Sequence, residues 1–480
     1  MDETPVLTPW IDGASLPLDN RVIDPIRHPY SGTAAARAAR GTEADLELAI
    51  GAAQAGFSRM RALARHERRD ILARIADALL RERASLGEEL ARSAGKPIGQ
   101  ALGEVDRAIL TFSFAADEAR RFGGETVPLD VDPRTIGYAG LTSRFAVGPI
   151  SAISPFNFPL NLLAHKVAPA IAVGSSLVVK PPPQCPQLAF RLARLMAECG
   201  LPKGACNVLH LPVPVAERLA TDPRFAMLSF TGSPGVGWHL KQVAGRKKVV
   251  LELGGNAAAV IHEDAENLDW VAQRLAVGAF SYAGQVCIKV QRLLVHRPIY
   301  DRFVQKFVDA SAALVTGDPL EPRTVVGPMI DAAAADRVER WIGEAVAAGA
   351  RALLPARRDG NVLSPTILAN APRDAKVTCQ EIFGPVATVA PYEDWAEALR
   401  TVNDSEYGLQ AGVFTRDVKR IFTAFNTLEV GGVVVNDFPT LRVDNFPYGG
   451  VKASGFGREG IRYAMEEMTE PRMLVLNLTR

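Results

Sequence analysis

The feature that most constrains the fold is a regular alternation of short apolar runs and longer amphipathic stretches, which begins near residue 146. The runs VGPISAIS, SLVVK, CNVLHL, FAMLSF and KKVVLELGG predict strands, and the stretches between them predict helices, one with an interior proline. Strand–helix–strand units of about 30 residues join parallel strands through right-handed crossovers. We therefore predict a parallel α/β sheet, with ligands bound at the carboxyl ends of its strands.

Helical and mixed regions flank this sheet in the sequence. Residues 44–121 predict helices, because apolar positions such as Ile71, Ile75 and Leu79 fall on one helical face. A second α/β region is predicted over about 254–450, with strands near VQRLLVH, PTILA and VGGVVVN. The final stretch, EPRMLVLNLT, alternates like an edge strand, which could pair with another chain or within its own chain.

The charge balance and the cysteines limit the classes of function. Lysine and arginine total 54 and acidic residues 53, and the resulting net charge of +1 argues against a general nucleic-acid-binding protein. The five cysteines fit no zinc-ligand spacing, so we expect no metal site, and unpaired thiols suggest a cytoplasmic protein. The N-terminus lacks the apolar segment of a signal peptide, and the longest apolar run, 167–179, is too short to span a bilayer. A chain of 480 residues is expected to form two to four domains.

Three polar residues stand out against apolar surroundings. Cys287, in SYAGQVCIKVQR, is a candidate nucleophile, but the nearest histidine is His296, so another group would have to act as base. Glu252 is the one charge inside the strand VVLELGG, and burial would raise its pKa toward the value that a general base needs. Asn157, in PFNFPLN, could donate to an oxyanion. The sequence leaves open that Glu252 reaches solvent and that Asn157 only supports its turn.

Two other stretches could bind a nucleotide. SFTGSPGVG, at 229–237, follows a strand and opens a helix, where backbone N–H groups favour phosphate, although it does not form the GxGxxG pattern. Lys180 closes the strand SLVVK and Glu381 begins EIFGPV, so each could hold a sugar hydroxyl. A solvated lysine and a simple turn are the alternatives for these two residues.

Together and in this order, the motifs resemble those of the aldehyde dehydrogenase superfamily. They are PFNFP (155–159), VVKP (178–181), FTGS (230–233), LELGG (251–255), GQVC (284–287), EIFGPV (381–386) and PYGGVKASGFGREG (447–460). The C-terminal segment is similar to the branch that contains lactaldehyde, non-phosphorylating glyceraldehyde-3-phosphate and phosphonoacetaldehyde dehydrogenases. The resemblance covers nearly the whole chain and implies an α/β fold with two parallel-sheet domains and a small β oligomerisation element.

The resemblance also implies a domain organisation and an assembly. A dinucleotide-binding domain would comprise residues 1–122 and 144–253, and a catalytic domain with the nucleophilic cysteine would comprise residues 254–452. Segments 123–143 and 466–480 would form oligomerisation strands that build a homodimer or a homotetramer.

In the reaction that the resemblance implies, NAD or NADP oxidises a small, possibly anionic aldehyde to the carboxylic acid. Cys287 would attack the carbonyl, Asn157 and the backbone N–H of Cys287 would hold the oxyanion, and Glu252 would activate water to hydrolyse the thioester. Lys166 would support the proton relay around Glu252. Residues expected to contact the cofactor are Ile153, Ser154, Pro155, Phe156, Lys180, Gly232, Ser233, Gly237, Leu253, Gly254, Glu381 and Phe383. Residues expected to contact the substrate are Arg107, Phe158, Val286, Ile288, Arg442 and Phe446.

Departures from the family's patterns bear on specificity. Many NAD-preferring members carry a glutamate three residues after the lysine of VVKP, and here that position is Pro183, so we predict that NADP is tolerated or preferred. Arg107 and Arg442 match or adjoin positions where relatives bind an anionic substrate, and the arginine fork suits such a group. A surface or interdomain position is the alternative for both arginines. Val286 stands where phosphate-binding relatives often carry arginine, which argues against a phosphate group.

Other classes of function fit the sequence less well. A CoA-acylating dehydrogenase generally lacks the glutamate of LELGG, which is Glu252 here. A Cys–His hydrolase needs a histidine in its site, and none of the motifs contains one. A binding or structural protein that kept the fold without catalysis would not need both Cys287 and Glu252.

Overall fold

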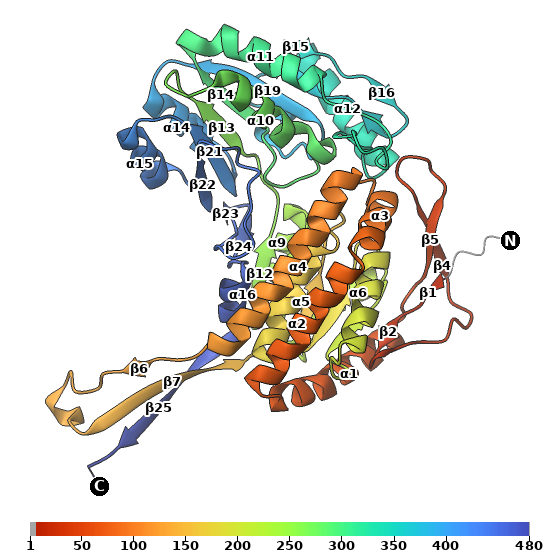
Figure 1. The fold of residues 1–480 in the computed structure, drawn as a ribbon, viewed down its shortest axis with the longest axis vertical. Helices are drawn as coiled ribbons and strands as arrows, with labels where there is room; N and C mark the ends of the chain where they lie inside the picture. Colours follow the sequence, from red (N-terminus) through yellow and green to blue (C-terminus); the bar gives the residue numbers. More distant parts are fainter. Residues whose placement is uncertain (1–5, 480) are drawn as a thin grey trace.

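The computed structural model describes residues 6–479, which form two α/β lobes and a projecting β arm (Figure 1). Two predicted segments extend beyond the described residues: 1–122 of the dinucleotide-binding domain includes residues 1–5, and the oligomerisation segment 466–480 includes residue 480. An eight-stranded sheet forms the first lobe, in the order β24 (Gly455–Phe456), β12 (Lys248–Glu252), β11 (Met227–Thr231), β8 (Ile150–Ile153), β9 (Leu177–Lys180), β10 (Cys206–Val208), β2 (Trp10–Ile11) and β3 (Ala14–Ser15). The strands from β12 to β10 are parallel, which confirms the prediction, and the outer strands are antiparallel.

Side chains alternate along these strands, so each face of the sheet builds its own core. Leu177 and Val179 lie in one core and Val178 in the other. Helices of the first core are α2 (Arg65–Arg81), α3 (Arg83–Ala94), α4 (Ile98–Arg121), α5 (Asn161–Val173), α6 (Gln187–Glu198) and α16 (Ile461–Glu467). Helices of the second core are α1 (Glu43–Ala62), α7 (Val213–Ala216), α8 (Arg218–Thr221) and α9 (Pro234–Val243). The helices predicted before residue 122 and the proline-containing helix α5 are confirmed.

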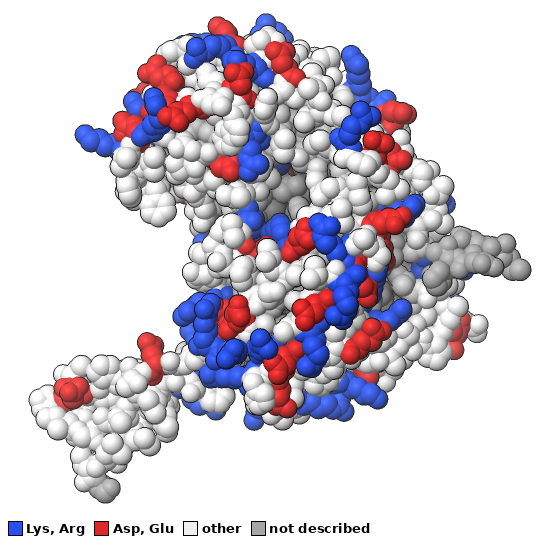
Figure 2. Space-filling view, viewed as in Figure 1, with Lys and Arg blue, Asp and Glu red and all other residues white. Residues whose placement is uncertain are grey.

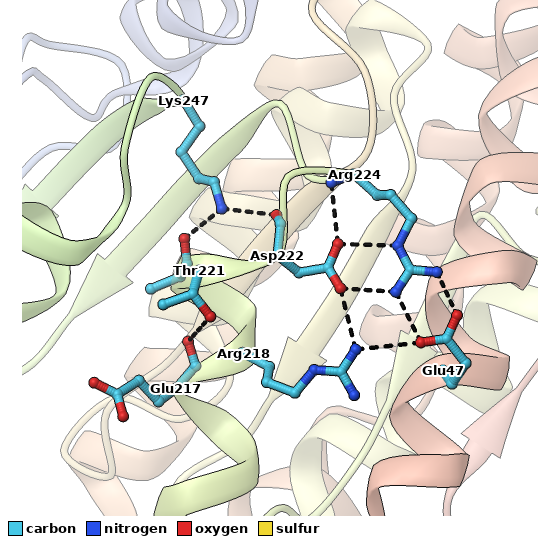
Figure 3. A network of polar contacts seen from close by, with 8 residues as sticks. Glu47, Glu217, Arg218, Thr221, Asp222, Arg224 and Lys247 are labelled. Atoms are coloured by element: carbon cyan, nitrogen blue, oxygen red, sulfur yellow. Dashed lines mark hydrogen bonds and ion pairs between the residues drawn. The ribbon is translucent and has the colours of Figure 1, made fainter.

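An ion-pair network fastens α1 to the segment after α8 (Figure 3). Glu47 accepts a hydrogen bond of 2.8 Å from Arg224 and one of 3.2 Å from Arg218, and both arginines also bind Asp222. Hydrogen bonds from Arg224 lower the pKa of Glu47 and of Asp222 to about 2. Because these values lie below the unfolded ones, the network stabilises the fold above a pH of about 4 and loses its effect as the pH falls toward 2.

The second lobe is built on a seven-stranded sheet. Its order is β15 (Arg351–Leu354), β18 (Thr366–Ala369), β19 (Val386–Tyr392), β14 (Arg292–His296), β13 (Ala258–Ile261), β21 (Gln410–Phe414) and β22 (Gly432–Val435). All strands but β15 are parallel. One face packs against α10 (Leu268–Phe280), α11 (Tyr300–Ala312) and α12 (Ala332–Ala347), and the other against α14 (Trp395–Asn403) and α15 (Val418–Thr427). The second predicted α/β region is thereby confirmed.

Shorter elements connect these parts. They are the sheet of β1 (Val6–Leu7), β5 (Ala34–Ala39) and β4 (Ile23–Arg27), the pairs β16 (Arg358–Asp359) with β17 (Val362–Leu363) and β20 (Tyr407–Gly408) with β23 (Val451–Lys452), helix α13 (Lys376–Cys379), and 3₁₀ helices at Pro133–Thr135, Ser281–Gly284 and Arg297–Ile299. Across residues 6–479, no helix has both the length and the apolar character needed to cross a membrane.

The arm consists of β6 (Thr126–Val127), β7 (Tyr138–Ala146) and β25 (Thr469–Asn477). The predicted terminal strand is confirmed, and β25 pairs antiparallel with β7 of its own chain along its whole length. Its other edge is free within the described part of the chain. The arm projects well beyond the first lobe, with the C-terminus near its tip (Figure 1). In-chain pairing therefore occupies one edge of β25 and leaves the other available.

Candidate active site

The loop that carries Cys287 follows a 3₁₀ turn with left-handed backbone conformations. Tyr282 has a φ of 53° and Gly284 a φ of 66°. A Cβ atom at Gly284 would collide with a backbone carbonyl oxygen, so only glycine fits there. Gln285 anchors the loop, because its buried side chain accepts a hydrogen bond of 2.9 Å from the amide of Ile330. The GQVC motif thus presents the cysteine on a constrained loop.

Cys287 lies half-buried, with its Sγ 3.2 Å from the hydroxyl oxygen of Tyr448. Burial raises the pKa of the thiol to about 11, although the hydrogen bond with Tyr448 acts in the opposite direction. Asn157 is buried beside the cysteine loop, and its Nδ2 donates to the carbonyl of Gln285 over 3.0 Å. One amide hydrogen therefore holds the loop, and the second is left for an oxyanion.

Glu252 is buried at the end of β12, and both of its carboxylate oxygens lack a hydrogen-bond partner among residues 6–479. Burial, together with repulsion from Glu459, raises the pKa of Glu252 well above its usual value. Two of the nearby cations pair with Glu459, Lys166 at 3.0 Å and Arg442 at 3.1 Å. Although burial opposes ionisation of Glu459, these two cations lower its pKa to about 2. A solvent-exposed position for Glu252 is thus excluded.

The two arginines predicted for the substrate lie close to this centre. Arg442 has only 5% of its side chain exposed, and its guanidinium stacks over the ring of Tyr448 at 3.7 Å, so a surface position is wrong for Arg442. Arg107 is partly exposed and pairs with Asp444 over 2.6 Å. Asp444 also binds His165 Nε2 over 2.7 Å, so Arg107 belongs to a polar network next to the centre.

An apolar cluster surrounds the cysteine. It contains all four of the predicted apolar substrate residues together with two others: Phe158, Val286, Ile288, Phe446, Leu409 and Tyr448. The ammonium group of Lys96 lies 3.5 Å above the ring of Phe158 and pairs with the buried Glu104. Glu104 also accepts from the amide of Leu160 over 2.9 Å, which fixes the segment that leads into α5. These side chains give Cys287 mainly apolar surroundings.

Unpaired polar groups gather at the carboxyl ends of the first sheet. The hydroxyl oxygens of Ser154 and Thr231, after β8 and at the end of β11, are buried and lack partners among the described residues. Among the described residues, the ammonium group of Lys180 at the end of β9 donates a hydrogen bond only to the carbonyl of Pro181, over 3.2 Å, and burial lowers its pKa to about 8. Ser233 precedes α9, is exposed and makes no side-chain cap. These donors suit an extended ligand with hydroxyl and phosphate groups, such as a dinucleotide.

The second lobe contributes a carboxyl group and an aromatic ring to the same region. Glu381 accepts a hydrogen bond of 3.0 Å from the amide of Gly255, and burial raises its pKa to about 7. A Cβ at Gly254 would collide with the Glu381 carboxylate. Phe383 adopts a φ of 42° and meets Phe156 edge to face at a ring separation of 5.8 Å. A sugar hydroxyl could bind Glu381 here.

The remaining predicted cofactor residues lie at or just after the ends of β8, β11 and β12 and in α9. Ile153 and Leu253 are buried at the ends of β8 and β12, and Pro155 is half-buried. A Cβ at Gly237 would collide with Leu253, so glycine lets α9 pack closely on the sheet. The amide of Gly232 donates to the Glu252 carbonyl over 3.0 Å, which ties the phosphate-type loop to the strand of the predicted base.

Away from this centre, His262, Glu263 and His296 place donor atoms within 4.8 Å of one another near the carboxyl end of the second sheet. The two imidazole rings stack at 4.4 Å with only 16° between their planes. Since imidazole lone pairs lie in the ring plane, these nitrogens do not converge on one ion. The expectation of no metal site stays a prediction.

Tyr448 and Glu459 are the main residues that sequence reasoning missed. Both lie inside the motif PYGGVKASGFGREG, and their backbones pair through hydrogen bonds of 2.9 and 2.7 Å. The motif therefore folds back on itself and delivers a hydroxyl and a carboxylate to the centre. The signal in the sequence was an aromatic residue and a charged residue near the two ends of a glycine-rich motif that turns back on itself.

The chain matches a family model described as aldehyde dehydrogenase family over residues 19–474. It is 44% identical to 3-sulfolactaldehyde dehydrogenase of Priestia aryabhattai over 454 residues, which is 94% of each chain. Aldehyde dehydrogenase 21 from Physcomitrella patens, solved with the reaction product succinate, is 41% identical with a TM-score of 0.97 and covers 99% of both chains. The glyceraldehyde-3-phosphate dehydrogenase GapN of Methanocaldococcus jannaschii, solved with NADP, is 37% identical with a TM-score of 0.91, and the match covers 96% of this chain and 100% of that one.

Proposed function

The chain belongs to the aldehyde dehydrogenase family, and on that premise we propose that its substrate is a small 2-hydroxyaldehyde with a singly charged anionic group, such as 3-sulfolactaldehyde. The enzyme oxidises an aldehyde to the carboxylic acid with NAD or NADP. The observation that carries the proposal is the buried guanidinium of Arg442, stacked on the tyrosine that touches Cys287. The name of the 44% identical relative supports the same class of substrate.

The charge of the centre favours a single negative charge. Lys166 and Arg442 pair with Glu459, and Arg442 also lies 3.9 Å from Asp444, which pairs with Arg107. Among these ion-paired side chains three cations face two ionised carboxylates, so one positive charge remains, and burial of Glu252 raises its pKa and disfavours a further negative charge. A sulfonate or carboxylate carries one negative charge, whereas a phosphate carries about −1.5 to −2. Val286 beside the nucleophile offers no second cation for a phosphate.

The proposed chemistry uses Cys287, Asn157 and Glu252. Cys287 adds as thiolate to the aldehyde carbon, and Asn157 with the backbone N–H of Cys287 stabilises the resulting oxyanion. When bound, the nicotinamide cofactor accepts the hydride, which leaves a thioester on the sulfur. Glu252 then takes a proton from water, which attacks the thioester and releases the acid. Glu252 supports hydrolysis by water over transfer to CoA.

The choice between cofactors rests on the end of β9. Pro183 is exposed there and supplies no carboxylate that would repel a 2′-phosphate, while Lys180 lies at the strand end. We expect NADP to be used at least as well as NAD. A kcat/KM with NAD that far exceeds the value with NADP would contradict this preference.

The arm supports assembly into a dimer or tetramer. Exposed apolar side chains gather on it: Leu141, Phe145, Met473, Leu474, Val475, Leu476 and Leu478. On the face drawn in Figure 2, the arm shows few charged side chains, in contrast to the body of the molecule. An apolar surface next to a free strand edge is typical of pairing between subunits.

All five cysteines are unpaired, which supports a cytoplasmic location.

One assay tests the substrate proposal. Reduction of NAD and of NADP is followed with 3-sulfolactaldehyde, succinic semialdehyde, lactaldehyde and glyceraldehyde 3-phosphate, each with and without CoA. The highest kcat/KM is expected for 3-sulfolactaldehyde, which has both the 2-hydroxyl and the singly charged group, without a requirement for CoA. A higher value with succinic semialdehyde would reject the 2-hydroxyl as part of the recognised substrate. A clear preference for neutral lactaldehyde or for the phosphate ester would reject the proposal, and dependence on CoA would reject hydrolysis by water.

A further inference from the structure

We infer that Tyr448 is a catalytic residue whose hydroxyl donates a hydrogen bond to the Cys287 sulfur and stabilises it as the thiolate. The inference rests on the proposed role of Cys287 as nucleophile. The two atoms lie 3.2 Å apart, and within residues 6–479 the hydroxyl makes no other hydrogen bond. This contact gives the cysteine the polar partner that the missing histidine does not supply.

The direction of the hydrogen bond follows from burial. Tyr448 has 3% of its surface exposed, and burial raises the pKa of its phenol well above the usual value. The phenol therefore keeps its proton over the pH range in which a thiol ionises. A protonated phenol next to a thiolate can only donate, so the hydrogen bond favours the charged form of the sulfur.

Three contacts hold this hydroxyl in place. The backbone of Tyr448 is fixed by two hydrogen bonds to Glu459, and the side chain of Glu459 is in turn held by Lys166 and Arg442. The ring packs in the apolar cluster around Cys287. The guanidinium of Arg442 lies 3.7 Å from the ring centre on one face. A cation over the ring makes the hydroxyl a stronger donor, because it draws electron density from the oxygen.

The consequence is a larger fraction of reactive thiolate. Even with the Tyr448 hydrogen bond in place, burial raises the pKa of Cys287 to about 11, and every unit of pKa changes the thiolate fraction at pH 7 tenfold. A hydrogen bond to a charged group opposes this shift. Tyr448 is not consumed, because the thiolate attacks the carbonyl carbon while the phenol keeps its own proton.

The test measures the pH dependence of Cys287 alkylation by iodoacetamide in a Cys379→Ser background, since Cys379 is the other partly exposed thiol. In Tyr448→Phe, the midpoint of the alkylation profile is expected to rise by about one unit. The kcat/KM at pH 7 should fall about tenfold and recover at high pH. The control is Tyr282→Phe, a change at a tyrosine just before the cysteine loop. It removes a buried hydrogen bond of 2.9 Å from the hydroxyl to the carbonyl of Ala94, and the midpoint of Cys287 alkylation should stay unchanged.

An unchanged midpoint in folded Tyr448→Phe would overturn the inference and leave the ring a packing role. If Tyr448→Phe does not fold, 3-fluorotyrosine at position 448 replaces it, because this residue keeps the ring and has a more acidic hydroxyl. It should lower the midpoint of Cys287 alkylation. A midpoint that does not shift would overturn the inference. Cys287→Ala separates this result from the proposed function. If Cys287→Ala still oxidises aldehydes, Cys287 is not the nucleophile and the proposed function is rejected. If Cys287→Ala is inactive and Tyr448→Phe behaves like the unchanged enzyme, only the role of Tyr448 is rejected.

Discussion

Lys166 Nζ lies 3.0 Å from Glu459 Oε1, and this ion pair leaves the neighbouring Glu252 without a hydrogen-bond partner in the described part of the chain. The cation that the family resemblance assigns to the relay around Glu252 thus binds a different carboxylate. Burial and the negative charge of Glu459 together keep the pKa of Glu252 high. A carboxyl group whose pKa is raised in this way accepts a proton more readily, which suits a general base.

Replacement of Glu459 by glutamine should move the acid limb of the kcat profile to lower pH. The substitution removes the negative charge that opposes ionisation of Glu252 and frees Lys166 and Arg442 to favour it. The base then stays ionised to lower pH. The measurement is kcat against pH, with Glu466→Gln on the surface of α16 as a matched control and thermal unfolding as a check of folding. An acid limb that does not move would show that Glu459 does not set the ionisation of the base.

Glu252→Gln should separate the two halves of the reaction. Hydride transfer needs the thiolate and the oxyanion donors, whereas hydrolysis of the thioester needs the base. We expect a rapid burst of about one reduced cofactor per site, followed by turnover that is slower by about 10²–10⁴-fold. Stopped-flow absorbance of the reduced cofactor measures both phases. Loss of the burst together with the steady state would contradict a role confined to hydrolysis.

The sequence predicted what local patterns encode and missed what only the folded chain brings together. The parallel strands follow from runs such as SLVVK, whose apolar residues supply both faces of the sheet. The contacts in the active site, by contrast, join residues that are far apart in the sequence. Cys287 and Tyr448 are 161 positions apart, and Lys166 and Glu459 are 293 positions apart. No periodicity relates such positions. The motifs located Cys287, Glu252 and Asn157, but the motif around Tyr448 and Glu459 did not reveal which of its side chains enter the centre.

Two charges on the arm should weaken assembly. Leu474 and Leu476 of β25 are 51% and 39% exposed and lie two residues apart, so they share a face of the strand. The double variant Leu474→Asp/Leu476→Asp should lower the mass measured by sedimentation, because burial of two carboxylates against another subunit is unfavourable. Val213→Asp, which changes a valine that is 79% exposed on α7 in the first lobe, serves as control. An unchanged mass for the double variant would exclude this face of the arm from the interface.

Arg442→Lys should reduce the preference for anionic aldehydes while it keeps the positive charge. Arginine can bind two oxygens of a sulfonate or carboxylate at once, whereas lysine offers a point charge on a flexible chain. We expect the ratio of kcat/KM for 3-sulfolactaldehyde to that for lactaldehyde to fall about tenfold, mainly through KM for the anionic substrate, since loss of one charge-assisted hydrogen bond has this magnitude.

The ratio of the two substrates cancels any change in the fraction of active enzyme, which matters because Arg442 is buried and paired with Glu459. Arg442→Ala should lower the same ratio further, since it removes the charge as well as the fork. It should also lower the thermal unfolding midpoint, because Glu459 then keeps only Lys166 as a cationic partner within the described residues. A ratio that stays constant in both variants would mean that Arg442 acts only on Tyr448 and Glu459, and that the anionic group of the substrate is bound elsewhere in the pocket.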